Sequence, residues 1–230
     1  MLSKTACPPD IKGVRAKILA TRGAHEAKLA AARAKVFKLH QLQGAGEEQG
    51  LELVRELSQQ LESFDAAVSP LWASLCDQAS ASASPAKSGG RGGRAMHQQV
   101  SRELFRLEMA LPVLSARARF EALVGGAGRF LVVKGSTGSG KSTQLPGYLA
   151  DMRMFAGQKI LVTEPRKVAA ITLAARVALE WSGGLLGGRG AVGYRAGGAS
   201  SEGSRIEFVT EGNFLAQLIR QSKGGGALDG

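Results

Sequence analysis

The chain has 230 residues, a formal net charge of +11 and a pI near 10.1, with glycine at 31 positions and aromatic residues at only 5%. This length allows one full domain with an arm, or two small domains. The positive charge favours a polyanionic partner, nucleic acid before an anionic membrane surface, with added solubility as the alternative. No apolar run approaches the ~20 residues that span a bilayer, so we expect a soluble chain with no membrane partner.

The cysteines and histidines indicate no metal site or disulfide framework. Two cysteines lie far apart, which is typical of an intracellular chain with unpaired thiols, nuclear or cytoplasmic. The three histidines stand in polar sequence and are predicted to lie at the surface; they are His25, His40 and His97. The first 40 residues are rich in Ala, Lys and Arg. We interpret them as a basic helix, with an organelle transit peptide as the alternative.

Two long helices are predicted in the first third of the chain. Residues 13–41 are Ala-rich with a weak apolar stripe. A sharper stripe follows the turn-like residues 44–46, with a 3.5-residue period that favours a coiled-coil seam: Leu57, Leu61, Phe64, Val68, Leu71 and Leu75. Pro70 predicts either a kink or a new helix start. We expect an antiparallel hairpin over 1–78. Simple helix-on-helix packing is the preferred interpretation, and an arm that docks a protein partner is the alternative.

Composition changes sharply after the hairpin. Residues 79–94 read ASASASPAKSGGRGGR, which predicts a flexible Gly/Ser/Arg linker over 79–95. Arg91 and Arg94 could touch RNA loosely, with a solvated linker as the other interpretation. A domain boundary is expected near residue 95, with a second domain over 96–230.

The second domain alternates predicted helices and strands. Two helices over 98–124 lead to an apolar strand, FLVV at 130–133, then a glycine-rich loop and a helix. Strands are predicted at 159–163, 191–194 and 205–210, and helices at 168–181 and 212–221. Strands separated by helices indicate an α/β fold with a mostly parallel sheet.

The loop after FLVV carries the clearest chemical pattern. Gly135, four residues, then Gly140, Lys141 and Ser142 form G-x-x-x-x-G-K-S/T, which is typical of a phosphate-binding loop. Glycines let several N–H groups face one oxyanion, and the following helix adds the positive end of its dipole. We expect Lys141 to reach the β and γ phosphates of ATP and the Ser142 hydroxyl to hold Mg²⁺.

A second cationic position follows the next strand. Arg166 and Lys167 stand at a strand-to-helix junction, on the edge where parallel sheets present binding surfaces. Two cations beside free helix N–H groups suit a second phosphate chain. A charged turn that caps a surface helix explains them equally well.

Five ordered segments resemble the DEAH-box RNA helicases. GSTGSGKSTQLPGYL is similar to their motif I and TEPRKVAAITLAARVA to motif Ia. VGY at 192–194 and IEFVTEGNFLAQL at 206–218 match later segments, and LPVLSARARFEALV resembles the family's L-P-I-x-x-x-R stretch. Within this family, the chain resembles most a plant-type subgroup that also carries RING domains.

The resemblance implies an ATP-dependent RNA helicase with a P-loop NTPase (RecA-like) fold. The nucleotide and magnesium would be held at matching positions: Gly138, Ser139, Gly140, Lys141, Ser142, Thr143 and the adenine-stacking Arg176. Lys141 is the candidate catalytic residue, and Ser142 the candidate metal ligand. Arg166 and Thr210, with Lys167 beside them, would grip the RNA backbone regardless of sequence. We expect a monomer.

The chain also departs from the family pattern. Ser136 replaces Glu, Glu164 replaces Gln, Glu211 replaces Asp, and Gly197 stands where the family has an arginine after V-G-Y. Asp-Glu-x-His does not occur in these 230 residues. The resemblance therefore implies the amino-terminal portion of the first RecA-like domain, an incomplete sheet preceded by the hairpin, without the hydrolytic acids. The alternatives are a nucleotide- and RNA-binding module without turnover, or an interaction arm with a vestigial NTPase fold.

Overall fold

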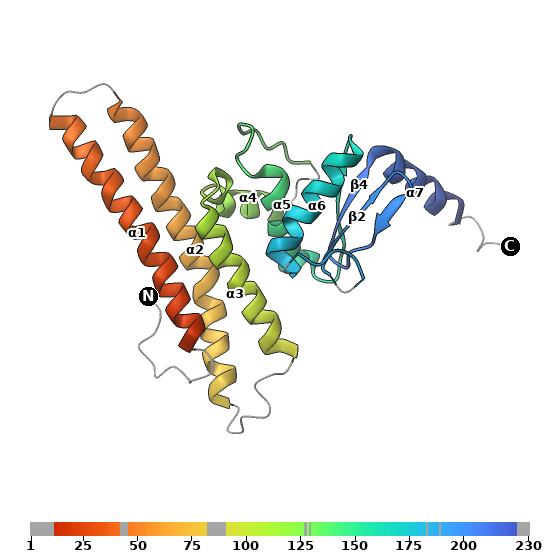
Figure 1. Cartoon of the computed structure of the whole chain (residues 1–230), viewed down its shortest axis with the longest axis horizontal. Helices are drawn as coiled ribbons and strands as arrows, with labels where there is room; N and C mark the ends of the chain where they lie inside the picture. The colour runs from red at the N-terminus through yellow and green to blue at the C-terminus, as the bar shows by residue number, and fades with distance from the viewer. Residues whose placement is uncertain are drawn as a thin grey trace. The chain divides into compact units, whose positions relative to one another are not determined.

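The computed structural model describes residues 12–41, 46–81, 91–126, 128, 130–182, 184–188 and 190–224. The chain forms two compact units, Met1–Phe120 and Glu121–Gly230. In Figure 1 the first unit runs from red to yellow-green and the second from green to blue. These units divide after Phe120, and the domain boundary predicted near residue 95 stays a prediction.

The first unit is a bundle of three long helices. They are α1 (Lys12–Gln41), α2 (Glu47–Ala81) and α3 (Arg91–Met109), followed by the short η2 (Pro112–Leu114) and α4 (Arg117–Gly125), which crosses into the second unit. The helices α1 and α2 run antiparallel, since Arg22 donates to Asp65 at 2.9 Å and the His25 ring lies 3.1 Å from the Leu57 carbonyl oxygen. The predicted helical hairpin is confirmed.

A third helix completes the core of this hairpin. The buried apolar side chains are Ile18 and Leu29 of α1, Phe64, Val68, Trp72 and Leu75 of α2, and Val100, Leu104 and Leu107 of α3. Three members of the predicted apolar stripe on α2 are therefore in the core, since α2 packs against both α1 and α3. Pro70 lies inside one continuous α2. A coiled-coil supercoil stays a prediction.

Two expectations about this part of the chain change. Residues 82–90 of the predicted linker lie outside the described residues, while 79–81 belong to α2 and 91–95 to α3. His25 was predicted at the surface, and this is wrong: its side chain is 2% exposed. The reason is that His25 lies on the same face of α1 as the core residues Ile18 and Leu29, seven residues after one and four before the other.

The second unit holds a four-stranded sheet. Its strands are β1 (Ile160–Glu164), β2 (Val192–Ala196), β3 (Ala199–Ser201) and β4 (Ile206–Thr210), in the order β1-β4-β2-β3. The pairs β1–β4 and β4–β2 are parallel, and the short β3, which was not predicted, pairs antiparallel with β2. The predicted mixed α/β fold with a mostly parallel sheet is confirmed.

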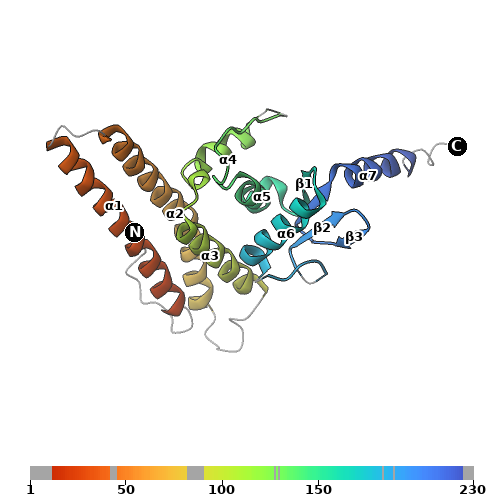
Figure 2. The ribbon, with the colours of Figure 1, turned by 45° about the horizontal axis from the view of Figure 1, so that its top comes forward.

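Helices α5 (Lys141–Asp151), α6 (Lys167–Ser182) and α7 (Glu211–Gly224) flank this sheet, and the short η3 (Arg153–Phe155) follows α5. Alanines at 170, 174 and 178 of α6 lie in one core cluster with Ile206 and Phe208 of β4. Small side chains let the helix lie close to the sheet. Figure 2 shows β2 and β3 beside α6, with α7 leading to the carboxyl terminus.

The predicted strand at 130–133 does not form. These residues have extended or irregular backbone outside the sheet, and Phe130 is 95% and Val132 83% exposed. A strand is stable only when a neighbour satisfies its backbone groups. No strand in the described part of the chain pairs with this segment, so its apolar composition alone does not make it a strand.

Candidate phosphate-binding site

The glycine-rich loop turns directly into α5. Gly138 and Gly140 have φ angles of 80° and 94°, a left-handed backbone that other residues adopt at a cost. Gly140 is the N-cap of α5. A Cβ on Gly135 would lie 3.1 Å from the Ser139 hydroxyl and 3.5 Å from the Lys141 side chain. The loop therefore closes on itself at Gly135 and reverses direction at Gly138 and Gly140.

This geometry leaves backbone donors at the start of α5. In the described residues, no backbone hydrogen bond is donated by the N–H groups of Gly138, Gly140, Lys141 or Ser142. The first N–H groups of a helix have no intrahelical acceptor, and the helix dipole places partial positive charge at this end. These donors fit the phosphate group that the sequence pattern predicts.

Lys141 lies within the loop. Its Nζ atom donates to the carbonyl oxygens of Gly135 and Ser136, both at 2.7 Å, and lies 3.2 Å from the Ser139 hydroxyl. The ammonium charge therefore stands beside the four donor amides. A phosphate that bound there would meet this cation without a large movement of the side chain.

The hydroxyl groups of the loop differ in availability. Ser139 is 7% exposed, and Ser142 is exposed on the first turn of α5. The Thr143 hydroxyl donates to the Gly140 carbonyl oxygen at 3.3 Å. The hydroxyl groups of Ser136, Thr137 and Ser142 are therefore open to solvent, and the Thr143 hydroxyl already has an acceptor.

Two contacts fix α5 behind the loop. The Gln144 amide donates to Glu180 of α6 at 3.0 Å, and Gln144 is only 4% exposed. Arg205 donates to the carbonyl oxygens of Ala150, Phe155 and Gln158, which lie at and beyond the end of α5. Arg176 lies one helical turn before Glu180 on α6, and the structure places it on the helix that packs against α5.

The predicted RNA-contacting residues gather at one edge of the sheet. Arg166 and Lys167 are exposed just after β1, and Thr210 ends β4, where its Cα pairs with that of Glu164. A Cβ on Gly197, in the turn after β2, would lie 3.4 Å from the Lys167 side chain. The parallel strands therefore bring these residues to the carboxyl edge together. The Thr210 hydroxyl accepts a hydrogen bond from Asn213 at 3.1 Å.

Sequence reasoning missed a buried charge cluster on the sheet. Glu207 of β4 is 1% exposed and contacts Lys159 at 3.2 Å and Arg195 at 2.8 Å. Burial alone lowers the pKa of Lys159, but hydrogen bonds from its ammonium to Glu202 and Glu207 outweigh this effect and raise the pKa. The sequence shows Lys159 one residue before the apolar strand β1 and Glu207 within the apolar strand β4. It does not show the strand register that brings the two side chains together.

A second buried cluster was also missed in the first unit. Glu103 of α3 accepts hydrogen bonds from Arg106 and Arg117, both at 2.6 Å, and the carboxylate is 1% exposed. Arg117 is the arginine of the L-P-x-x-x-x-R stretch that resembles the DEAH-box pattern. The resemblance singles out Arg117, and the structure shows that Arg117 donates to Glu103.

The described ranges contain no cluster of three or more His, Cys, Asp or Glu side chains that could hold a metal ion. Among the described helices, none combines the length and apolarity needed to cross a membrane.

Several curated RNA helicases are similar to this chain. The chain is 43% identical over 95 residues to ATP-dependent RNA helicase DEAH12, chloroplastic, of Arabidopsis thaliana, which is 41% of this chain and 5% of that protein. It is 46% identical over 92 residues to the human probable ATP-dependent RNA helicase DHX40, a match that covers 39% of this chain and 11% of that protein. It is 40% identical over 115 residues to human ATP-dependent RNA helicase DHX33, a match that covers 49% of this chain and 16% of that protein.

No family model matches the chain. The chain spans between about a twentieth and a sixth of the length of these curated relatives. Identity of 40–46% over some 92 to 115 residues, together with the phosphate-binding geometry, is far beyond what a shared fold alone requires. Within the matched segment, this chain is a relative of the DEAH-box ATP-dependent RNA helicases.

Proposed function

We propose that the second unit binds the phosphates of ATP at residues 135–143 and the RNA backbone at the carboxyl edge of its sheet, as part of an ATP-dependent RNA helicase. The observation that carries this proposal is the set of free amides at Gly138, Gly140, Lys141 and Ser142 beside the Lys141 ammonium. Backbone donors at a helix start bind phosphate without any sequence-specific side chain.

Each site residue has a role in this proposal. The free amides of Gly138, Gly140, Lys141 and Ser142 hold the phosphate oxygens. The Lys141 ammonium neutralises negative charge that develops during transfer. The Ser142 hydroxyl holds Mg²⁺, which when bound supplies a further positive charge to the phosphates. Ser139 fixes the loop, and Arg176 stacks on the adenine ring.

RNA binds through its phosphates at the carboxyl edge of the sheet. Arg166 and Lys167 supply charge, and the Thr210 hydroxyl supplies a hydrogen bond. Because none of these groups reads a base edge, binding is independent of sequence and weakens with salt. A nuclear or cytoplasmic location and a monomeric state belong to this proposal, and the printed name "chloroplastic" of the Arabidopsis relative makes organelle import the alternative.

The test is saturable binding of a fluorescent Mg-ATP analogue to the full 230-residue chain. Lys141→Ala is expected to weaken binding by at least roughly tenfold, because a charge-assisted hydrogen bond contributes about 1.5–3 kcal/mol. Arg153→Ala removes an equal charge from the exposed η3 of the same unit and is expected to leave binding unchanged. Absence of saturable binding, or equal loss in both variants, contradicts the proposal.

Phosphate release separates the enzymatic proposal from a binding module. Binding with release no faster than in buffer, with and without RNA, identifies a nucleotide- and RNA-binding module without turnover. Release that RNA stimulates and Lys141→Ala abolishes identifies a hydrolase. Capture of a protein partner by the first unit, with no nucleotide binding by the second, identifies the interaction arm instead.

A further inference from the structure

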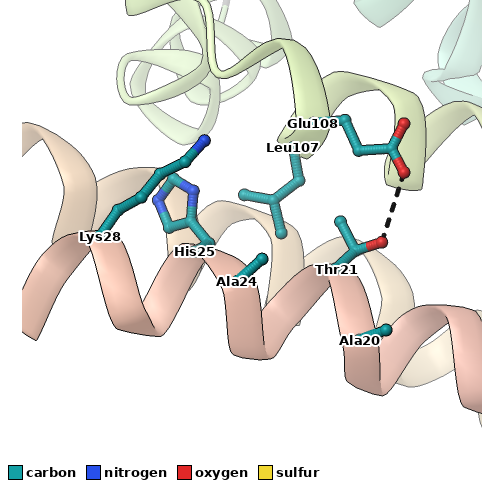
Figure 3. Close-up of a pocket in the computed structure, with 7 residues that line it drawn as sticks. All are labelled: Ala20, Thr21, Ala24, His25, Lys28, Leu107 and Glu108. Carbon is teal, nitrogen blue, oxygen red and sulfur yellow. Dashed lines mark hydrogen bonds between the residues drawn. The ribbon is translucent and has the colours of Figure 1, made fainter.

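A pocket opens between α1 and α3 in the first unit. Figure 3 shows it with Thr21, Ala24, His25 and Lys28 of α1 on one side and Leu107 and Glu108 of α3 on the other. Its volume is about 330 Å³. The side chain of Ala24 is short, so a ligand in the pocket can approach the α1 backbone closely.

A row of lysines on α1 runs past the pocket. Lys17, Lys28 and Lys35 are all exposed on α1 and stand eleven and seven residues apart. With 3.6 residues per turn, these spacings place the three side chains on one line along the helix. We call these three residues the lysine row. It extends along ~27 Å of α1 at 1.5 Å per residue, and Lys28 joins it to the pocket.

The charges of the lysine row are not neutralised within the described residues. None of the three lysines makes an ion pair or hydrogen bond there, whereas Arg22 pairs with Asp65 and Glu26. Glu26, the one acid of α1, is nine residues before Lys35 and so lies on the opposite side of the helix. An unpaired row of like charges attracts a partner that repeats negative charge at regular intervals.

The pocket also contains an unsatisfied buried polar atom. The His25 ring is 2% exposed and its Nε2 bonds the Leu57 carbonyl, but its Nδ1 has no hydrogen-bond partner in the described structure. Since a carbonyl only accepts, Nε2 carries the proton and Nδ1 is an acceptor. Burial lowers the pKa of His25, which keeps the ring neutral. The His25 ring lines the pocket, and its Nδ1 atom is a covered acceptor to which no group donates.

We propose that the lysine row and the α1–α3 pocket form a second RNA-binding surface, on which the lysines hold backbone phosphates and the pocket receives a nucleoside. A regular line of phosphates matches a line of lysines, and a nucleoside that enters the pocket lies against the His25 ring. This inference takes RNA as the substrate class from the proposed function, but it does not depend on the ATP-binding loop.

One acidic group opposes a phosphate at this surface. Glu108 accepts a hydrogen bond from Thr21 at 3.5 Å and lines the pocket. Its charge repels phosphates nearby, so RNA that passes the pocket should bind more tightly to Glu108→Gln. This expectation has the opposite sign from the lysine substitutions, and a general effect of protein folding would not produce both.

The test is fluorescence anisotropy of a labelled 20-nucleotide oligouridine with the full chain, over a range of salt. Lys28→Gln with Lys35→Gln removes two members of the lysine row. The matched control is Lys12→Gln with Arg33→Gln, which removes the same charge from exposed positions on the opposite side of α1. Circular dichroism checks that the helices of each variant form.

The lysine-row variant is expected to reduce the slope of log affinity against log salt by about 1.4, since each phosphate contact on a single strand contributes about 0.7. At 0.1 M salt this slope corresponds to about 25-fold weaker binding. Arginine at both positions should restore binding. The control variant should change the slope by much less than the lysine-row variant.

Several results overturn the inference. Equal effects of the two variants identify a general charge effect. A lysine-row variant that binds RNA normally, while Arg166→Ala does not, leaves the proposed function standing and removes the second surface. If the lysine-row variant self-associates less than the unchanged chain in light scattering but binds RNA equally well, the partner of the lysine row is the acidic α2 of another copy. Absence of RNA binding by the unchanged chain overturns both proposals.

Discussion

Glu103 shows how one residue organises the first unit. Its buried carboxylate bonds two arginines, Arg106 from the next turn of α3 and Arg117 from the start of α4. Arg117 is fourteen residues further along the chain, so the pair fixes η2 and the turn before it against α3. Burying three charges is costly, but they compensate one another only when all are present.

Glu103→Gln is expected to destabilise the first unit by about 3–5 kcal/mol, because it removes the buried negative charge that two buried guanidinium groups bond. Urea unfolding followed by circular dichroism measures the change. Glu26→Gln removes a carboxylate that is half-exposed and pairs with Arg22 on the surface, and it should cost at most about 1 kcal/mol. Equal costs for the two substitutions would show that the buried Glu103 carboxylate stabilises the first unit no more than a surface carboxylate does.

The candidate phosphate site shows what sequence can predict at the scale of residues. The glycine and lysine positions identify the loop, because only glycine adopts the φ angles of Gly138 and Gly140 without strain. The pattern does not predict that Lys141 bonds the carbonyl groups of Gly135 and Ser136. It also does not predict Gln144–Glu180, because that contact depends on how α5 packs on α6.

At the scale of elements, β2 depends on a glycine for close packing. A Cβ on Gly193 would overlap the backbone of Ser201 and Gly203 and lie 2.7 Å from the Glu202 carbonyl carbon. Gly193 is the centre of the V-G-Y segment, so its backbone must approach the chain that leaves β3. This close approach explains the residue type without any contact to a ligand.

Gly193→Ala is expected to destabilise the second unit by about 1–3 kcal/mol or more, since backbone cannot move aside as a flexible side chain does. Gly198→Ala is the matched control, because a Cβ there meets nothing within 4 Å and its φ is not left-handed. Thermal unfolding of both variants measures the difference. A Gly193→Ala chain as stable as the control would mean that the strands separate more easily than this packing implies.

The elements divide into those that sequence predicts and those that it does not. Periodic apolar spacing predicts α1, α2 and α6 because each helix buries one face. The residues of 130–133 are as apolar as β1, but they have no pairing partner in the described chain and so form no strand. The three residues of β3 were missed because a short polar segment has no periodic signal, and its antiparallel pairing with β2 supplies its stability.

At the scale of the whole molecule, charge is separated within the first unit. Helix α1 carries eight Lys and Arg residues and one Glu, while α2 carries seven acids and one Arg. The net charge of +11 therefore does not describe a uniformly basic surface. The sequence predicts a polyanionic partner, but only the helix geometry locates the lysine row that could bind it.

The two compact units also have separate cores, since Ile18, Phe64 and Leu107 belong to the first and Ala174, Ile206 and Phe208 to the second. We expect each core to unfold cooperatively by itself, because burial within a unit is what makes unfolding all-or-none. Differential scanning calorimetry of the full chain should then resolve two transitions. Glu103→Gln should lower the temperature of one, and Gly193→Ala the temperature of the other. A single transition that both substitutions shift by the same amount would mean that the two cores unfold as one cooperative structure.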